Sequence, residues 1–110
     1  MTIGGAKVKT LEYDAIYSNG DSGTTKTIDW DNGNCQSVTM TDNCTFTFSN
    51  PLRPTLRLFV SNGGSVYAAT WPGTVVWKDN TAPTFTANRM YICDFFYDGT
   101  NYYAQGAEYY

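Results

Sequence analysis

The sequence predicts an all-β fold, an antiparallel β-sandwich of jelly-roll type with an N-terminal arm. The large apolar side chains are mostly aromatic, with nine Tyr, six Phe and three Trp, and aromatic residues favour strands. Short runs alternate between apolar and polar residues with the two-residue period of a strand. Clusters of Asn, Asp and Gly separate these runs, as turns do. A small barrel is the alternative arrangement.

A chain of 110 residues forms one domain with one hydrophobic core. Residues 1–23 differ in composition from the rest, with Gly4-Gly5 near the start and a glycine-rich hinge at 19–23. We expect this segment to form an arm, which either docks on a neighbouring molecule or frays as a terminus. Residues 24–110 form the β-sandwich domain.

The first four predicted strands cover residues 24–30, 35–40, 44–48 and 55–60. Each strand has apolar residues at alternate positions, so one of its faces is apolar. These predicted core positions are Ile28, Trp30, Val38, Met40, Cys44, Phe46, Phe48, Leu56, Leu58 and Val60. All four strands can therefore line one interior.

The turn clusters at residues 31–34, 41–43 and 62–64 fit hairpin loops. They predict that consecutive strands pair antiparallel, with further strands over residues 65–71 and 75–77. Asn50-Pro51 and Arg53-Pro54 interrupt the chain before the fourth strand, because proline has no N–H to donate to a sheet.

Near the end of the chain, residues 90–97 form a strand, 98–101 a turn and Tyr102 begins the returning strand. Tyr91, Cys93 and Phe95 lie on one face of this hairpin, and Ile92 and Phe96 on the other. Both faces are largely apolar, although a strand half exposed to water normally has one polar face. Either a second layer of this chain or another molecule covers the second face.

Several segments taken together carry a family resemblance, namely Thr27-Ile-Asp-Trp30, Asn43-Cys-Thr-Phe-Thr-Phe48, Thr70-Trp-Pro72, Val75-Val-Trp77 and Tyr97-Asp-Gly-Thr-Asn-Tyr102. Over about residues 24–106 the chain resembles a small β domain of tailed-bacteriophage virion structural proteins, of tail-fibre and head-decoration type. The resemblance implies a virion protein made in the host cytoplasm that assembles as a homotrimer. The short chain favours a capsid decoration (cement) or connector subunit. The alternative is a tail-fibre, receptor-binding or carbohydrate-binding module.

The leading hypothesis is a structural protein that binds its own copies and other virion proteins, such as the major capsid or tail proteins. Exposed aromatic residues are common at such interfaces. The predicted interface residues are Ile92, Phe96, Tyr102, Tyr103, Tyr109 and Tyr110. Trp71 is the candidate for stacking on a host surface glycan, since alternation assigns Trp30 and Trp77 to the core.

The sequence argues against catalysis, because it has no His and most acidic residues lie in turns, where they bond the local backbone. An acid pair for glycoside cleavage, such as Asp29 with Asp94, stays open as an alternative. A calcium site at residues 29–34 is a minor alternative, and no cofactor is expected. The net charge is −3 and the seven Lys and Arg are scattered, which excludes a nucleic-acid interface. No apolar run is long enough for a membrane span.

The chain has three cysteines, Cys35, Cys44 and Cys93. We interpret them as small buried side chains in a reducing environment. A disulfide between Cys35 and Cys44 is the alternative if a tight hairpin places them opposite each other.

Overall fold

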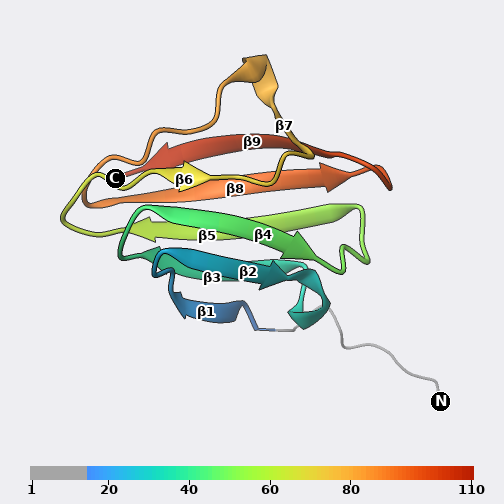
Figure 1. Ribbon diagram of the computed structural model, residues 1–110, viewed down its shortest axis with the longest axis horizontal. Coiled ribbons are helices and arrows are strands. Elements are labelled where there is room, and N and C mark those ends of the chain that lie inside the picture. The colour runs from blue at the N-terminus through green and yellow to red at the C-terminus, as the bar shows by residue number, and fades with distance from the viewer. Residues whose placement is uncertain (1–14) are drawn as a thin grey trace.

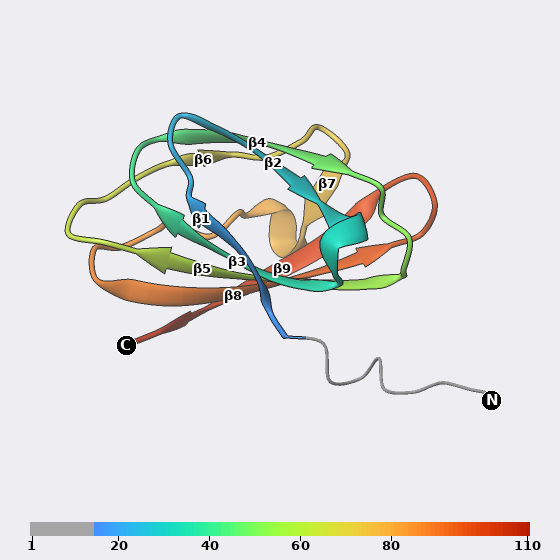
Figure 2. The ribbon, with the colours of Figure 1, turned by 90° about the horizontal axis from the view of Figure 1, so that it is seen from below.

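A computed structural model of the protein describes residues 15–110, which form two β-sheets packed face to face (Figures 1 and 2). The six-stranded sheet has the order β1 (Tyr17–Asp21), β3 (Cys35–Met40), β5 (Thr55–Asn62), β8 (Arg89–Tyr97), β9 (Tyr102–Tyr109) and β7 (Val75–Trp77). The three-stranded sheet has the order β2 (Thr25–Asp29), β4 (Cys44–Ser49) and β6 (Ala69–Thr70). Two short 3₁₀ turns, η2 (Trp30–Asn32) and η3 (Lys78–Asn80), complete the described elements. The all-β prediction is confirmed.

The first six strands wind as a flattened coil. Successive strands alternate between the two sheets, so that β1, β3 and β5 stack in parallel in one sheet and β2, β4 and β6 stack in parallel in the other. Each turn of the coil thus contributes one strand to each sheet. Thr27 and Thr47 occupy equivalent places on neighbouring turns, and their hydroxyl oxygens lie 2.7 Å apart.

The predicted hairpins between the early strands are wrong. The turns at residues 31–34, 41–43 and 62–64 cross from one sheet to the other instead of joining paired neighbours. Antiparallel pairing is correct for β5 with β8 and for β8 with β9. The expected jelly-roll arrangement needs antiparallel neighbours, and the parallel coil does not follow it.

The core lies between the two sheets and contains the side chains that alternation assigned to it. The predicted core residues that are buried are Ile28, Trp30, Val38, Met40, Cys44, Phe46, Leu56, Leu58 and Val60. Phe48 is partly buried and packs against them. Phe95 contributes from β8, and its ring centroid lies 5.1 Å from that of Phe48. The period-two analysis of individual strands is confirmed.

Among residues 15–110, three buried residues are polar, namely Ser22, Gln36 and Asn62. Gln36 on β3 is 0% exposed, and its Nε2 donates to the carbonyl oxygens of Asp29 at 2.7 Å and Gly33 at 2.8 Å. Its Oε1 accepts a hydrogen bond from Nδ2 of Asn19 at 3.0 Å. The amide therefore joins β1, β3 and the turn that leaves β2.

The described sheet begins at Tyr17, within the segment 1–23 that was expected to form an arm. β1 pairs with β3, and the backbone N–H of Ser22 donates to the carbonyl oxygen of Thr39 at 2.7 Å. Residues 1–14, where most of the predicted arm falls, lie outside the described part of the chain.

The C-terminal hairpin is confirmed, with β8 and β9 paired along their whole length from Met90–Tyr109 to Tyr97–Tyr102. In its turn, Oδ1 of Asp98 accepts hydrogen bonds from the backbone N–H groups of Thr100 and Asn101, at 2.9 and 2.8 Å. Gly99 adopts φ 103°, a conformation that favours glycine.

The strand predicted over residues 65–71 is reduced to the two residues of β6. The segment before it is held as a loop, because Nδ2 of Asn62 donates to the carbonyl oxygens of Ser65 and Thr86, both at 2.9 Å. These side-chain hydrogen bonds hold the segment in place of the backbone hydrogen bonds of a strand.

All three cysteines are free, and the alternative Cys35–Cys44 disulfide does not form. Cys44 is buried between the sheets, whereas Cys35 belongs to the other sheet and points away from the core. Cys93 is fully buried.

Candidate functional site

The most distinctive surface is the outer face of the six-stranded sheet, which points away from the core. The three-stranded sheet covers the inner face of the larger sheet, and no second layer of the described chain covers the outer one (Figure 2). Residues on β5, β8 and β9 whose neighbours are buried point outward, because strand side chains alternate. The register of the strands shows which of these outward side chains lie side by side in a row across the sheet.

Three apolar side chains form the row nearest the hairpin turn, which we call the apolar row: Val76, Phe96 and Tyr103. Tyr103 lies opposite Phe96 on β8 and opposite Val76 on β7. Each of the three is 45% exposed. Three adjacent strands thus present apolar surface to solvent.

A hollow of about 210 Å³ adjoins the apolar row. It lies where β7 runs beside β9, and the sheet's short edge strand forms one wall. Its lining residues are Val76, Trp77, Lys78, Phe96, Tyr103, Ala104 and Gln105. All three residues of the apolar row line this hollow, so the exposed rings of Phe96 and Tyr103 form part of its wall.

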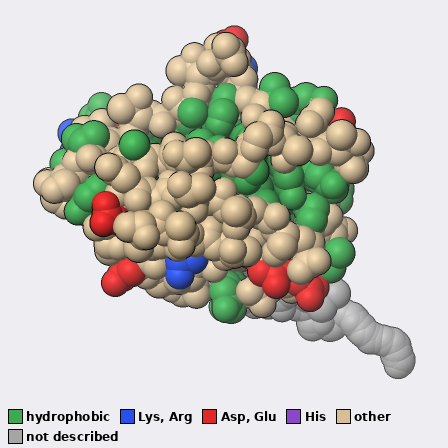
Figure 3. All heavy atoms as spheres, in the orientation of Figure 1, with side chains coloured by type: hydrophobic (Ala, Val, Ile, Leu, Met, Phe, Trp, Pro, Cys, Tyr) green, Lys and Arg blue, Asp and Glu red, His purple; other side chains and the backbone are tan. Residues whose placement is uncertain are grey.

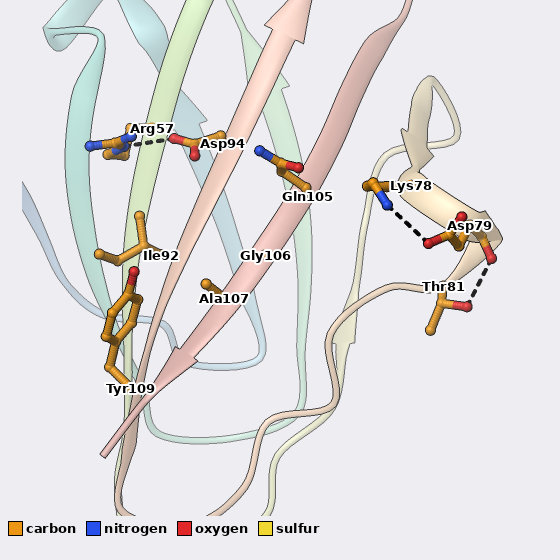
Figure 4. A pocket seen from close by; sticks show the side chains of 10 residues that line it. All are labelled: Arg57, Lys78, Asp79, Thr81, Ile92, Asp94, Gln105, Gly106, Ala107 and Tyr109. Carbon is orange, nitrogen blue, oxygen red and sulfur yellow. Dashed lines mark hydrogen bonds and ion pairs between the residues drawn. The ribbon is translucent and has the colours of Figure 1, made fainter.

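A larger depression, which we call the outer trough, crosses β5, β8 and β9 and is bounded by η3 (Figure 4). Its volume is about 730 Å³. The lining residues are Arg57, Lys78, Asp79, Thr81, Ile92, Asp94, Gln105, Gly106, Ala107 and Tyr109. Arg57, Asp94 and Gln105 occupy one cross-strand row, directly beside the apolar row.

An ion pair fixes the centre of the outer trough. Nε of Arg57 donates to Oδ1 of Asp94 at 2.6 Å. The hydrogen bond and the charge of Asp94 raise the pKa of the Arg57 guanidinium above its usual value. A second pair, Lys78 Nζ with Asp79 Oδ2 at 3.1 Å, lies at the η3 wall.

The six predicted interface residues fall into separate environments. Phe96 and Tyr103 lie in the apolar row, and Ile92 and Tyr109 line the outer trough. Tyr110 is 94% exposed, and the guanidinium of Arg89 lies 4.2 Å from its ring centroid.

Tyr102 does not belong to any exposed patch. It is 5% exposed and packs in the core, with its ring centroid 5.1 Å from that of Phe48 and 4.6 Å from that of Tyr97. Tyr102 pairs with Tyr97, whose side chain points inward, so the strand register places both on the core side.

Trp71, the candidate for glycan stacking, lies in an aromatic cluster. Its ring stacks on Phe46 with centroids 5.0 Å apart and an interplanar angle of 15°. Trp77, Phe85 and Phe95 surround the rest of the ring at 5.3 to 6.3 Å. This side chain is only partly exposed, and its flat face is already covered.

Figure 3 shows the opposite face of the molecule, which is formed by the three-stranded sheet. Few charged side chains appear on it, and hydrophobic side chains gather in the upper half of the view. On this face the outward side chains of β2 and β4 include the paired threonines Thr27 and Thr47.

The proposed acid pair does not exist, because Asp29 and Asp94 lie on different sheets. Asp29 accepts hydrogen bonds from the backbone of Asp31 and from Nδ2 of Asn50, both at 3.0 Å. These bonds lower the pKa of its carboxyl. In residues 15–110 there is no cluster of three or more His, Cys, Asp or Glu side chains suited to a metal ion.

Sequence reasoning missed Val76, Arg57, Lys78 and Gln105 as surface-site residues. Arg57 carried a signal, since it is a charged residue at an outward position of β5, on the same face as Asp94 of β8. Recognising the site required the strand order, which brings Val76 and Lys78 beside β9.

Within the described part of the chain, no helix is long and apolar enough to cross a membrane. Comparisons with protein-family models, curated proteins and solved structures found no match to this chain.

Proposed function

We propose that the protein is a non-enzymatic structural subunit of a bacteriophage particle, a capsid decoration or connector protein that assembles with copies of itself. A homotrimer is the expected assembly, and other virion proteins would contact the assembled subunits. The observation that carries the proposal is the exposed apolar row of Val76, Phe96 and Tyr103, on a sheet face that no second layer formed by residues 15–110 covers. The bacteriophage setting rests on the sequence resemblance.

Contiguous exposed apolar surface is typical of an interaction site on a soluble protein. Burying a Phe side chain that was exposed contributes about 1.5–3 kcal/mol. Because the row presents two aromatic rings and one Val together, one contact with a partner would remove all three from water.

A second copy of the chain is the occupant that fits this end of the face. Phe96 is 45% exposed and lines a hollow of about 210 Å³, so each copy offers both an exposed ring and a recess. Surfaces that carry both can associate symmetrically, each ring entering the partner's recess. Of the seven described residues that line the hollow, one is charged, and Lys78 already pairs with Asp79. Charge repulsion therefore does not oppose the contact.

The alternative function, a receptor-binding or carbohydrate-binding module, would use the outer trough instead of the apolar row. Trp71 gives it little support because its ring packs on Phe46. The polar groups of the trough are the feature that favours a ligand.

The test of the assembly is the Phe96→Asp variant, studied by size-exclusion chromatography with light scattering. We expect this variant to be a folded monomer under conditions where the unchanged protein is an oligomer. The control is Val66→Asp, which places the same charge at a loop residue that is 66% exposed and outside the row. An oligomer of unchanged size in the Phe96→Asp variant would contradict the proposal.

A further inference from the structure

We propose that the outer trough is a binding site for a neutral saccharide, recognised by the polar row Arg57, Asp94 and Gln105 together with the ring of Tyr109. This site is separate from the apolar row, and a sugar could bind whether or not copies of the chain associate.

The formal charges in the trough cancel in pairs. Arg57 pairs with Asp94 at 2.6 Å, and Lys78 pairs with Asp79 at 3.1 Å. A site for an anion would leave its cations unpaired, and a site for a cation would leave its carboxylates unpaired. The balance therefore favours a ligand without net charge.

The same groups keep hydrogen-bonding capacity for a ligand. The ion pair uses Nε of Arg57 and Oδ1 of Asp94, which leaves the terminal guanidinium nitrogens as donors and Oδ2 as an acceptor. Gln105 supplies one further donor group and one acceptor from the next strand. Sugar hydroxyls both donate and accept, so they match a row in which donors and acceptors alternate across three strands.

Apolar surface lies beside this polar row. Ile92 and Ala107 form the floor on the next row, and Tyr109 is 51% exposed at the end of β9. In Figure 4 the ring of Tyr109 extends along the sheet toward Ile92. A pyranose ring has an apolar face of C–H groups, and an exposed aromatic side chain provides flat, apolar contact area for such a face.

The geometry also limits the size and strength of binding. A volume of about 730 Å³ falls within the range of roughly 300–1,000 Å³ that ligand pockets occupy. The trough lies open on the sheet surface, so a bound sugar would keep much of its contact with water. We therefore expect weak binding of a mono- or disaccharide, with a dissociation constant of about 1 mM.

The test is saturation-transfer difference NMR on the full-length protein with free glucose, galactose, mannose and N-acetylglucosamine. Each sugar is titrated to about 20 mM, which is well above the expected dissociation constant. At least one sugar should show transfer to its ring protons and a saturating titration. Gln105→Ala and Tyr109→Ala should each weaken this binding about tenfold, with thermal unfolding used to show that both variants are folded.

The matched control is Tyr17→Ala, which removes an exposed tyrosine from β1 at the far edge of the same sheet. We expect sugar binding by this variant to equal that of the unchanged protein. An equal loss in the control, no transfer to any of the four sugars, or tighter binding of inorganic phosphate than of the sugars would each overturn the proposal. Phosphate binding would instead identify an anion site at Arg57 and Lys78.

Discussion

The side-chain Nε2 of Gln36 lies 2.7 Å from the carbonyl oxygen of Asp29, in a position with no exposure to solvent. This contact ties a strand of the large sheet to the end of the neighbouring strand in the small sheet. The other bonds of the same amide reach Gly33 and Asn19. One buried side chain therefore bonds to both ends of the crossing from β2 to β3.

Replacing Gln36 with Leu should destabilise the protein by about 2–4 kcal/mol, because the backbone acceptors of Asp29 and Gly33 would remain buried without donors. Urea unfolding followed by circular dichroism measures the difference. Gln105→Leu is the control for the loss of an amide at an outward-facing position, and we expect it to change stability by no more than about 0.5 kcal/mol. Equal effects of the two substitutions would contradict the structural role of Gln36.

Trp71→Ala should cost about 3–5 kcal/mol, because the substitution removes a ring that stacks on Phe46 and contacts four other aromatic residues. The unfolding free energy and the near-ultraviolet circular dichroism should both report the loss. The comparison is Leu52→Ala, at a residue that is 67% exposed. A stable Trp71→Ala variant with altered ligand binding would instead support the original surface role of this residue.

The hairpin turn should be sensitive to acid through Asp98. Backbone N–H groups of Asn101 and Thr100 lower the pKa of its carboxyl in the folded protein. A lowered folded pKa means that the carboxylate contributes stability above about pH 4, where Asp is ionised in the unfolded chain. That contribution is lost as the pH falls through the folded pKa.

Asp98→Ala should therefore lower the urea midpoint at pH 7, and the gap from the unchanged protein should narrow as the pH falls below about 4. A gap that is independent of pH would show that the carboxylate charge does not contribute to the turn.

The cysteines should react in a fixed order. Burial raises the pKa of the Cys93 thiol to about 12, so very little thiolate exists at this site at pH 8. Cys35 is partly exposed on the outer side of the large sheet, whereas Cys44 is buried. Iodoacetamide at pH 8, followed by mass spectrometry of the peptides, should label Cys35 first and Cys93 last. In concentrated urea the three rates should converge, and early labelling of Cys93 in the folded protein would contradict the burial of this side chain.

The positions of most strands could be predicted from the sequence, but the pairing between the early ones could not. Alternation identified the core residues on β3, β4 and β5 because each strand buries one face. The turn residues 31–34 fit both a hairpin and a crossing between sheets, and local preferences do not distinguish the two. A better signal was the similarity of Thr25–Asp29 to Thr45–Ser49, which align in parallel on successive turns of the coil.

The surface sites, too, could be predicted only in part, because they depend on which strands pair. The apolar outer side of β8 was visible in Ile92 and Phe96, because neither residue fits a solvent-exposed strand face. Tyr102 was assigned to the wrong side because its register depended on the hairpin pairing with Tyr97. Arg57, Asp94 and Gln105 come from three strands, and only the strand order brings them into one row.

The most direct measurement of the central proposal is the mass of the unchanged protein in solution, determined by light scattering over a dilution series. The chain mass is 12.2 kDa. If the apolar row is buried between copies, light scattering should detect a species whose mass is an integral multiple of that value, and the family resemblance implies a trimer. This species should persist at about 1 µM, a concentration that corresponds to about 8 kcal/mol of association free energy. A species of 12.2 kDa at every concentration up to about 1 mM, where association would be worth no more than about 4 kcal/mol, would contradict it.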